Sequence, residues 1–241
     1  MRLSENEVET LVQVTGSESI IHPRDLSSGF GIRPETVSRI TTQLKEKGLL
    51  ERDDHGIVLA EATPAESFKR LYYTHRASPF RAILADRRAD LLYRLDQTQK
   101  SVETLSRETG LPSKTIYYYL KDFIRLGIVR RTKSVRGYLY SFNYLLWREL
   151  KDFVTSLQEY RFRRLIPRDT LLIKSYSDNI LFKSIRHHDA TPTSFSAYGN
   201  YGVDLGLRDN YYTLPKRKLS IEEVFIHSLD SAETLQQRLF C

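Results

Sequence analysis

The sequence predicts a mainly α fold with small β wings, built as two tandem copies of one unit followed by a small α+β module. The first observation is an internal repeat, because residues 26–52 align without a gap with residues 105–131 at an offset of 79. The second is that each stretch has the apolar spacing of two short helices joined by a tight turn. The third is that the basic residues gather around the second copy. A repeat of this length is too long for a solenoid and indicates tandem domains.

The two aligned stretches share glycines and a pattern of apolar residues. Gly31 and Gly110 fall between the two short helices, where a positive φ lets the chain reverse. Gly48 and Gly127 fall where a helix ends and a strand begins. Six matched apolar pairs are expected to keep one helical face buried in both copies: Ile32/Leu111, Val37/Ile116, Ile40/Tyr119, Leu44/Phe123, Leu49/Ile128 and Leu50/Val129.

The first copy, residues 1–62, is predicted to hold three helices and a two-stranded wing. Ser4 and Glu7 form a capping box that starts the first helix. A short helix is expected around residues 24–28, and a third helix opens with Pro34 in its first turn. The wing consists of strands 49–52 and 57–60 around the polar turn Asp53-Asp54-His55-Gly56.

The second copy repeats this plan. A helical linker is expected over residues 63–84, and the copy itself covers residues 85–143. Its first helix is predicted to run without a break from Phe80 to Leu95, and its second helix follows the N-cap Ser101. This second helix covers residues 102–109. A third helix is predicted at 113–126, and two strands are predicted at 128–131 and 137–142.

Both copies resemble the winged helix-turn-helix domains of the MarR and ArsR families of prokaryotic regulators, over residues 1–62 and 80–143. The resemblance implies that the third helix and the wing of a copy contact DNA. Metal sensing is not carried over, because the chain has a single cysteine, Cys241, and lacks the cysteine set of many ArsR relatives.

The charge distribution favours DNA contact by the second copy. Residues 63–164 hold 21 Lys and Arg against 10 Asp and Glu, a net charge of +11, whereas residues 1–62 stand at −4. Residues 165–241 carry nine charges of each sign. A concentrated basic excess is expected where a phosphate backbone docks. The alternative interpretation is a basic surface that serves solubility alone.

The candidate DNA-binding residues of the second copy lie on the outward face of its third helix and along its wing. Lysines pair with phosphates or guanine edges, and tyrosines offer hydroxyls and rings to the backbone and to thymine methyl groups. The alternative for the two tyrosines is partial burial against another domain. The set comprises Lys114, Thr115, Tyr117, Tyr118, Lys121, Arg130, Arg131, Lys133 and Arg136.

The first copy presents a weaker set of candidates. Arg33, Thr36, Arg39 and Thr42 occupy the matching helical face. Its wing tip is acidic and is expected to repel phosphate. The first copy is therefore either a weaker DNA reader or a domain used for packing.

Residues 144–164 form a predicted connecting helix with an apolar stripe that consists of Leu146, Leu150, Phe153, Leu157 and Tyr160. The spacing of four, three, four and three residues is that of a coiled-coil seam. Two interpretations stay open: the stripe packs on the chain's own domains, or it forms a dimer seam. A two-fold dimer would suit a winged-helix reader of two half-sites.

The C-terminal module, residues 165–241, is predicted to contain a hairpin, a short helix at 193–202, a strand at 211–214 and a final helix capped by Ser220. The module resembles the C-terminal region of abortive-infection antitoxins of the AbiE type. The resemblance rests on Ser196-Ala197, Tyr201-Gly202 and Leu214-Pro215-Lys216-Arg217. It implies a protein partner for the module.

No catalytic residue, metal site or cofactor is predicted. His187 and His188 are adjacent and point apart in regular structure. His227 is expected on the surface or in packing, since no nucleophile pairs with it in sequence. The module lacks the Gly-Ser and Asp-x-Asp pairs of a nucleotidyltransferase, and no glycine-rich phosphate loop is present.

The sequence thus predicts a cytoplasmic prokaryotic transcriptional regulator that binds specific double-stranded DNA and is antitoxin-like in its C-terminal module. No apolar run approaches the ~18 residues of a membrane span, and a lone cysteine suits a reducing compartment. A homodimer and a protein partner of the module are further expectations. The alternatives are a plasmid or viral replication initiator and a winged-helix scaffold that binds protein, with an enzyme as the third.

Overall fold

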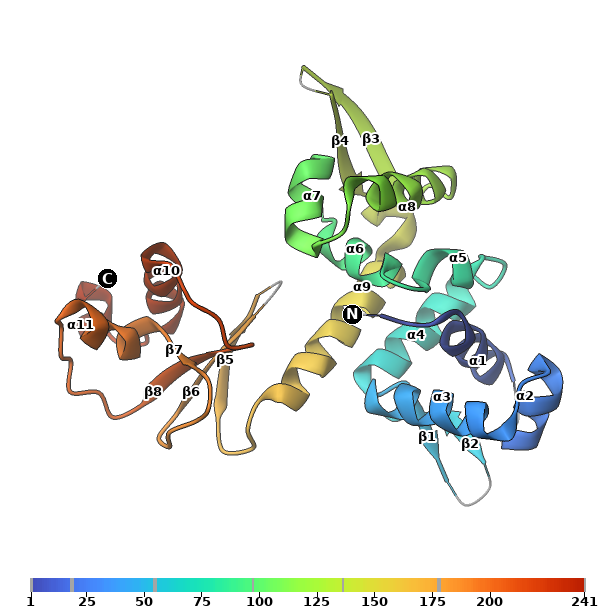
Figure 1. Ribbon diagram of the computed structural model, residues 1–241, viewed down its shortest axis with the longest axis horizontal. Coiled ribbons are helices and arrows are strands. Elements are labelled where there is room, and N and C mark those ends of the chain that lie inside the picture. The colour runs from blue at the N-terminus through green and yellow to red at the C-terminus, as the bar shows by residue number, and fades with distance from the viewer. Residues whose placement is uncertain are drawn as a thin grey trace. The chain divides into compact units, whose positions relative to one another are not determined.

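The computed structural model describes residues 2–17, 20–53, 56–96, 98–135, 137–176 and 179–240. The fold belongs to the mixed α+β class and is mainly helical with small antiparallel sheets (Figure 1). The chain divides into two compact units, Met1–Tyr160 and Arg161–Cys241. The first unit holds both copies of the repeat, and the second includes the whole of the predicted module, residues 165–241.

The first copy folds in the predicted order of three helices and a hairpin. The capping box at Ser4 is confirmed, because its Oγ accepts from the Glu7 amide at 3.2 Å and its amide donates to the Glu7 carboxylate at 2.6 Å. The elements are α1 (Glu5–Gly16), α2 (Pro23–Phe30), α3 (Pro34–Glu46), β1 (Leu50–Arg52) and β2 (Ile57–Leu59). The strands are antiparallel, and Leu50 pairs with Leu59.

The second copy contains one helix break that the sequence does not predict. The expected single helix over residues 80–95 is wrong, because the chain forms two helices around Asp86, whose φ is +61°. Asp86 pairs there with Leu3 through backbone hydrogen bonds of 3.3 and 2.6 Å, so a tertiary contact overrides helix continuity. The elements are α4 (Thr63–Thr74), α5 (Phe80–Leu84), α6 (Arg88–Arg94), α7 (Val102–Thr109), α8 (Ser113–Arg125), β3 (Val129–Ser134) and β4 (Gly137–Phe142).

The same hydrogen bond closes the turn between the two short helices in both copies. Ser27 Oγ donates to the carbonyl of Ile32 at 2.6 Å, and Ser106 Oγ donates to the carbonyl of Leu111 at 2.7 Å. The glycine of each turn is left-handed as predicted, with φ of +61° in the first copy and +67° in the second. The repeat in sequence is therefore a repeat of local structure.

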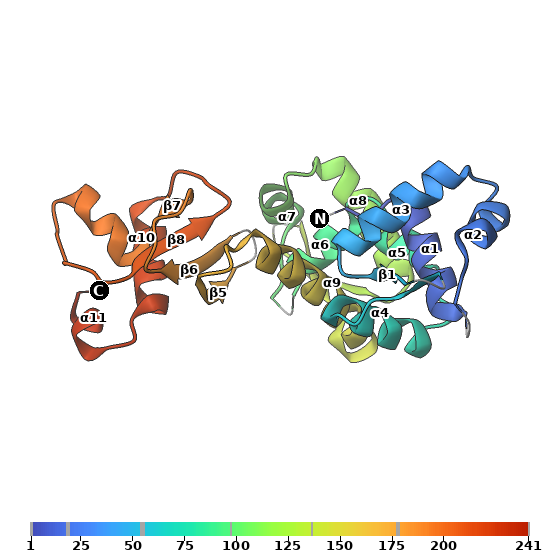
Figure 2. The ribbon, with the colours of Figure 1, turned by 90° about the horizontal axis from the view of Figure 1, so that it is seen from below.

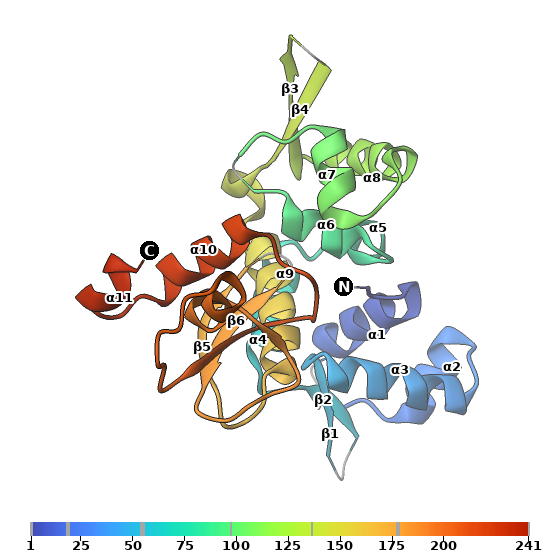
Figure 3. The ribbon, with the colours of Figure 1, turned by 60° about the vertical axis from the view of Figure 1, so that its left-hand side comes forward.

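A third backbone segment joins each hairpin and extends the repeat beyond the aligned stretch. Ile21 forms an antiparallel bridge with Ile57, and Lys100 forms one with Tyr140. Ile21 and Lys100 are also 79 residues apart. The strands β3 and β4 have six residues each, against three each in β1 and β2, and the two hairpins project from the helical body in different directions (Figure 3).

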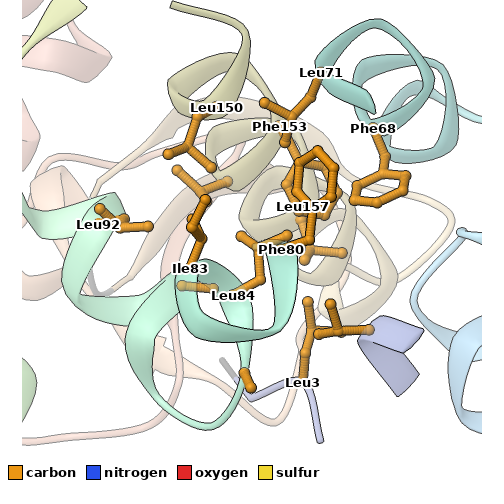
Figure 4. Close-up of a cluster of buried hydrophobic side chains, with 14 of the residues drawn as sticks. Leu3, Phe68, Leu71, Phe80, Ile83, Leu84, Leu92, Leu150, Phe153 and Leu157 are labelled. Carbon is orange, nitrogen blue, oxygen red and sulfur yellow. The ribbon is translucent and has the colours of Figure 1, made fainter. Parts of the chain in front are cut away.

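One continuous hydrophobic core runs through both copies and through the helix α9 (Tyr144–Leu165). Figure 4 shows the central part, where Phe68 of α4 meets Phe153 of α9 edge-to-face with ring centroids 5.1 Å apart. Leu150, Phe153 and Leu157 are 0 to 2% exposed. The interpretation as packing on the chain's own domains is confirmed for these three residues. These side chains are buried in the core of the chain itself, so they are not available for the seam of a dimer.

The ends of the predicted stripe behave differently from its centre. Leu146 is 57% exposed, and Tyr160 is half-buried over the backbone of Gly48. Trp147 departs from helical geometry with φ −134° and ψ 34°, so the first turn of α9 is set off by a kink. The Trp147 ring stacks on the His75 ring, with the two ring centroids 4.2 Å apart. The kinked turn of α9 thus contacts the end of α4.

The second unit is a four-stranded antiparallel sheet with short helices (Figure 2). The strand order is β5-β6-β8-β7, and the predicted hairpin is confirmed as β5 and β6. Its helix after Ser220 is capped as predicted but is not the last, because one more short helix follows. The elements are β5 (Leu171–Ser175), β6 (Ile180–Ser184), β7 (Thr191–Pro192), the 3-10 helix η1 (Ser194–Tyr201), β8 (Asn210–Leu214), α10 (Ile221–Ser231) and α11 (Leu235–Leu239).

The two equivalent helix-end glycines predict unequal costs of substitution. Gly48 and Gly127 have φ of +68° and +71°, so alanine at either is strained by about 1–2 kcal/mol. A methyl group at Gly48 would also lie 2.5 Å from the Tyr160 ring, whereas at Gly127 it would lie 3.8 Å from Leu146. We expect Gly48→Ala to lower the free energy of unfolding in urea by about 1–3 kcal/mol more than Gly127→Ala does. Equal losses would show that Tyr160 does not pack on Gly48.

A buried lysine predicts a pH dependence of stability. Lys151 of α9 is 8% exposed, and its Nζ donates to the carbonyls of Tyr93 and Leu92 at 2.7 and 3.3 Å and to that of Leu95. It thereby caps the end of α6. Burial lowers the pKa of Lys151 from 10.5 to about 8, against the opposing attraction of Asp96.

Between pH 8 and 10.5 the unfolded chain therefore binds more protons at Lys151 than the folded chain does. The free energy of unfolding consequently increases as the pH rises. We expect the free energy of unfolding of the wild type, minus that of Lys151→Met, to increase by about 2 kcal/mol from pH 8 to pH 10. The comparison with methionine cancels the titration of the other groups. A difference that is flat or falls over this range would contradict the assignment.

Candidate nucleic-acid interface

The helix α8 turns a polar face outward because its apolar residues point into the core. Ile116, Tyr119, Leu120 and Phe123 are buried. The glycine turn before the helix and the matched serine hydrogen bond fix where it starts. The predicted outward residues lie on the opposite side: Lys114, Tyr117, Tyr118 and Lys121 are exposed, and Thr115 is half-buried.

The hairpin of β3 and β4 carries the predicted basic residues of the wing. Arg130, Arg131 and Lys133 are exposed on β3. The Arg131 guanidinium lies 4.5 Å from the ring centre of Tyr138 on β4, which holds it in place without removing its charge. Arg136, also predicted to bind DNA, lies outside the described residues.

The helix face and the wing are electrostatic neighbours. Burial raises the pKa of Tyr140 on β4, the Tyr117 hydroxyl of α8 raises it further, and Arg131 opposes both. The helix α8 also contacts the strand β3 directly, so the helix and the wing adjoin. Tyr117 is 53% exposed, so it is accessible to a partner.

The positive charges of this surface are unpaired, whereas four other basic residues of the second copy are neutralised by acids. Among the described residues, no acidic side chain lies within ion-pair distance of the exposed lysines of α8 or the basic residues of β3. The neutralised pairs are Arg87–Asp90 at 2.7 Å, Arg88–Asp122 at 3.1 Å, Lys100–Glu108 at 2.9 Å and Arg125–Asp122 at 3.4 Å. The predicted face thus keeps free positive charge, although Lys69 and Arg76, outside this face, are also exposed and without an ion pair among the described residues.

An open cleft of about 850 Å³ lies beside α8 and involves Lys114, Thr115 and Tyr118. Beneath it, the Arg88 guanidinium lies 4.4 Å from the ring centre of Tyr119 and 5.4 Å from that of Tyr118. Arg88 thereby orients the exposed Tyr118. Sequence reasoning missed Arg88, because its position on α6 becomes relevant only through the helix break at Asp86.

The first copy offers less free charge at the matching place. Arg33, Arg39 and Thr42 are exposed on or beside α3, and Thr36 is half-buried. The Thr42 hydroxyl already donates to a backbone carbonyl of its own helix. Lys47 is paired with the buried Glu7.

The wing tip of the first copy remains acidic where it is described. The Asp53 carboxylate accepts from the Gly56 amide at 2.8 Å, while Asp54 and His55 lie outside the described residues. A carboxylate held at the tip repels phosphate.

The polar groups of the second unit are arranged as packing contacts. His227 is 3% exposed, and its Nδ1 lies 2.7 Å from Thr193 Oγ1, so it is a buried packing residue and not a surface one. His188 Nε2 lies 2.8 Å from Ser184 Oγ, and His187 Nδ1 lies 3.2 Å from the Tyr212 hydroxyl. Within the described ranges, no three His, Cys, Asp or Glu side chains come together as a metal-binding group.

Comparison with known proteins gives no match to a protein-family model and no match among curated proteins. In the part of the chain that the structure describes, none of the helices combines the length and the apolar character that crossing a membrane requires. The geometry of α8 and its wing therefore carries the functional argument.

Two residues of the cleft beside α8 predict unequal effects on stability when each is replaced by methionine. Arg88 is 8% exposed and paired with Asp122, whereas Lys114 is exposed and unpaired. We expect Arg88→Met to lower the free energy of unfolding by about 2 kcal/mol, because it leaves a half-buried carboxylate with a weaker partner. Lys114→Met should change it by less than about 0.5 kcal/mol. Equal effects in urea titrations would refute the distinction between a structural and a free cation.

Proposed function

We propose that this chain is a transcriptional regulator that binds specific double-stranded DNA through two winged helix-turn-helix domains in tandem, with the second as the main reader. The observation that carries the proposal is the concentration of unpaired positive charge on α8 and β3. Helix-turn-helix proteins read bases with the second helix of the motif, and α8 holds that place in the second copy.

The side chains of the proposed interface divide into two roles. Lys114, Tyr117 and Lys121 are placed on the helix that would enter the major groove, where lysine contacts guanine and tyrosine contacts backbone or a thymine methyl group. Arg130, with the rest of the β3 cations, lies on the wing, which would contact the neighbouring minor groove or phosphates. In this proposal the helix α8 supplies specificity, and the wing supplies affinity.

The first copy is proposed as an accessory DNA contact. Its free cations, Arg33 and Arg39, lie on the face of α3 that corresponds to α8. The acidic tip at Asp53 disfavours a backbone contact by its wing. The continuous core ties its orientation to that of the second copy, so the spacing between two contacted DNA segments would be fixed.

The proposal predicts that the wing residues account for part of the salt dependence of DNA affinity. With a duplex selected from source genomic DNA, replacing Arg130, Arg131 and Lys133 with alanine should reduce the slope of log affinity against log salt by about 2.5, since three phosphate contacts are lost. The matched control replaces three exposed basic residues of the same basic segment, Lys69, Arg70 and Arg76, with alanine.

The control variant removes the same charge and should keep the wild-type slope. Fluorescence anisotropy over a range of salt concentrations measures both variants. An equal loss of slope in the control would favour a nonspecific basic surface. Unchanged affinity of the wing variant at low salt would exclude the second copy as the reader.

A further inference from the structure

The helices α3 and α8, which hold the same place in the two copies, lie on one side of the first unit. Figures 2 and 3 both show α3 and α8 toward one edge of this unit, with α4 and α9 toward the opposite edge. The helix α1 contacts both α3 and α5, and α5 contacts α8, so α1 and α5 pack between the two helices. A straight duplex that runs along this side of the unit passes both α3 and α8.

The two wings point away from each other. In Figures 1 and 3 the hairpin of β3 and β4 extends toward the top of the view, and the hairpin of β1 and β2 extends toward the bottom. A half turn about an axis that passes through the side with α3 and α8 reverses the direction of a wing and leaves its helix on the same side. The two copies are therefore arranged like the subunits of a two-fold dimer, which read half-sites of opposite orientation.

Direct contacts fix this arrangement in addition to the shared core. Asp86, between α5 and α6, exchanges two backbone hydrogen bonds with Leu3, which precedes α1. Arg81 of α5 donates to the carboxylate of Glu9 on α1 at 2.9 Å and also pairs with Glu5. The spacing between α3 and α8 is therefore a property of the folded unit.

The two helices present different side chains at equivalent positions. All of these side chains are exposed. Arginine pairs with guanine and a carboxylate accepts from cytosine, whereas tyrosine contacts the backbone or a thymine methyl group. Helices with different base-contacting groups recognise different sequences, so the two half-sites differ. At the offset of 79 residues, Lys114, Tyr117, Tyr118 and Lys121 of α8 correspond to Glu35, Ser38, Arg39 and Thr42 of α3.

We propose that one copy of this chain reads a single duplex at two dissimilar half-sites of opposite orientation, with α8 in one major groove and α3 in the next. This inference rests on the proposed function and specifies the DNA that the site takes. Half-sites on one face of B-DNA lie about 10 bp apart, centre to centre. Helix-turn-helix proteins commonly present two readers by forming a dimer. In this chain the common core holds two readers together in one molecule.

Insertions between the two half-sites test the fixed spacing. The probe is the duplex selected from source genomic DNA, in which a hydroxyl-radical footprint locates the half-sites. Inserting half a helical turn or a full turn, about 5 or 10 bp, should weaken binding about 10-fold in each case, because the packed unit does not reach the displaced half-site. Fluorescence anisotropy measures the affinity. Recovery of full affinity with the full-turn insertion would overturn the proposal, since it requires readers that move independently.

The variant Arg39→Ala tests whether α3 takes part. It should weaken binding to the selected duplex about 10-fold but change binding to the full-turn insertion duplex less than about twofold, since α3 contacts no half-site there. The matched control Lys69→Ala removes an exposed cation of α4, on the opposite side of the unit, and should leave both affinities within about twofold. Circular dichroism confirms that both variants are folded. An equal loss on both duplexes would contradict a specific contact by α3.

Tethered cleavage tests the opposite orientation of the half-sites. In a chain with Cys241→Ser, an iron chelate attached through Glu51→Cys on β1 or Thr132→Cys on β3 should cut the duplex at the two opposite ends of the footprint. Sedimentation should give one chain per duplex. Cleavage by either wing in the middle of the footprint, or two chains per duplex, would overturn this inference alone. A full chain that binds no selected duplex at low salt would refute the proposed function itself.

Discussion

The burial of one face of α9 is the constraint on which the first unit depends. Phe153 and its neighbours fill a core that neither copy of the repeat could close alone, and Phe153 meets Phe68 edge-to-face. Tyr160 covers the helix-end glycine of the first copy, and Lys151 caps a helix of the second. Because one helix packs on both copies of the repeat, the two copies form a single compact unit.

This packing determines which charges remain free. The helix break at Asp86 brings Arg88 under α8. There its guanidinium forms an ion pair with Asp122 and lies over tyrosine rings. The cations of the outward face of α8 and of β3 have no acidic partner among the described residues, so they keep their charge free, although Arg131 lies over the ring of Tyr138. Net charge alone, at +11 over residues 63–164, does not distinguish these two groups of basic residues.

Local structure could be predicted from the sequence wherever a short motif determines it. The capping boxes at Ser4 and Ser220 and the left-handed glycines are confirmed, and five of the six apolar pairs are buried in both copies, while Ile32 of the sixth is only partly buried. Each of these features depends on residues close together in the chain. The break at Asp86 and the kink at Trp147 could not be predicted, since they coincide with contacts to Leu3 and His75, which are distant in sequence.

The role of the predicted stripe on α9 also could not be decided from the sequence. Its spacing fitted both a dimer seam and an intramolecular core, and only the burial of Leu150 and Leu157 separates the two. The predicted DNA-binding residues of α8 and β3 are exposed except for the half-buried Thr115, while their partner stays a proposal.

Hydrogen exchange of the full chain, with and without a duplex selected from genomic fragments, tests the central claim most directly. The account predicts that DNA slows exchange in residues 113–125 and 129–142, with weaker protection in α3 and none in α10. Protection confined to residues 161–240, or absent from the second copy, would contradict it.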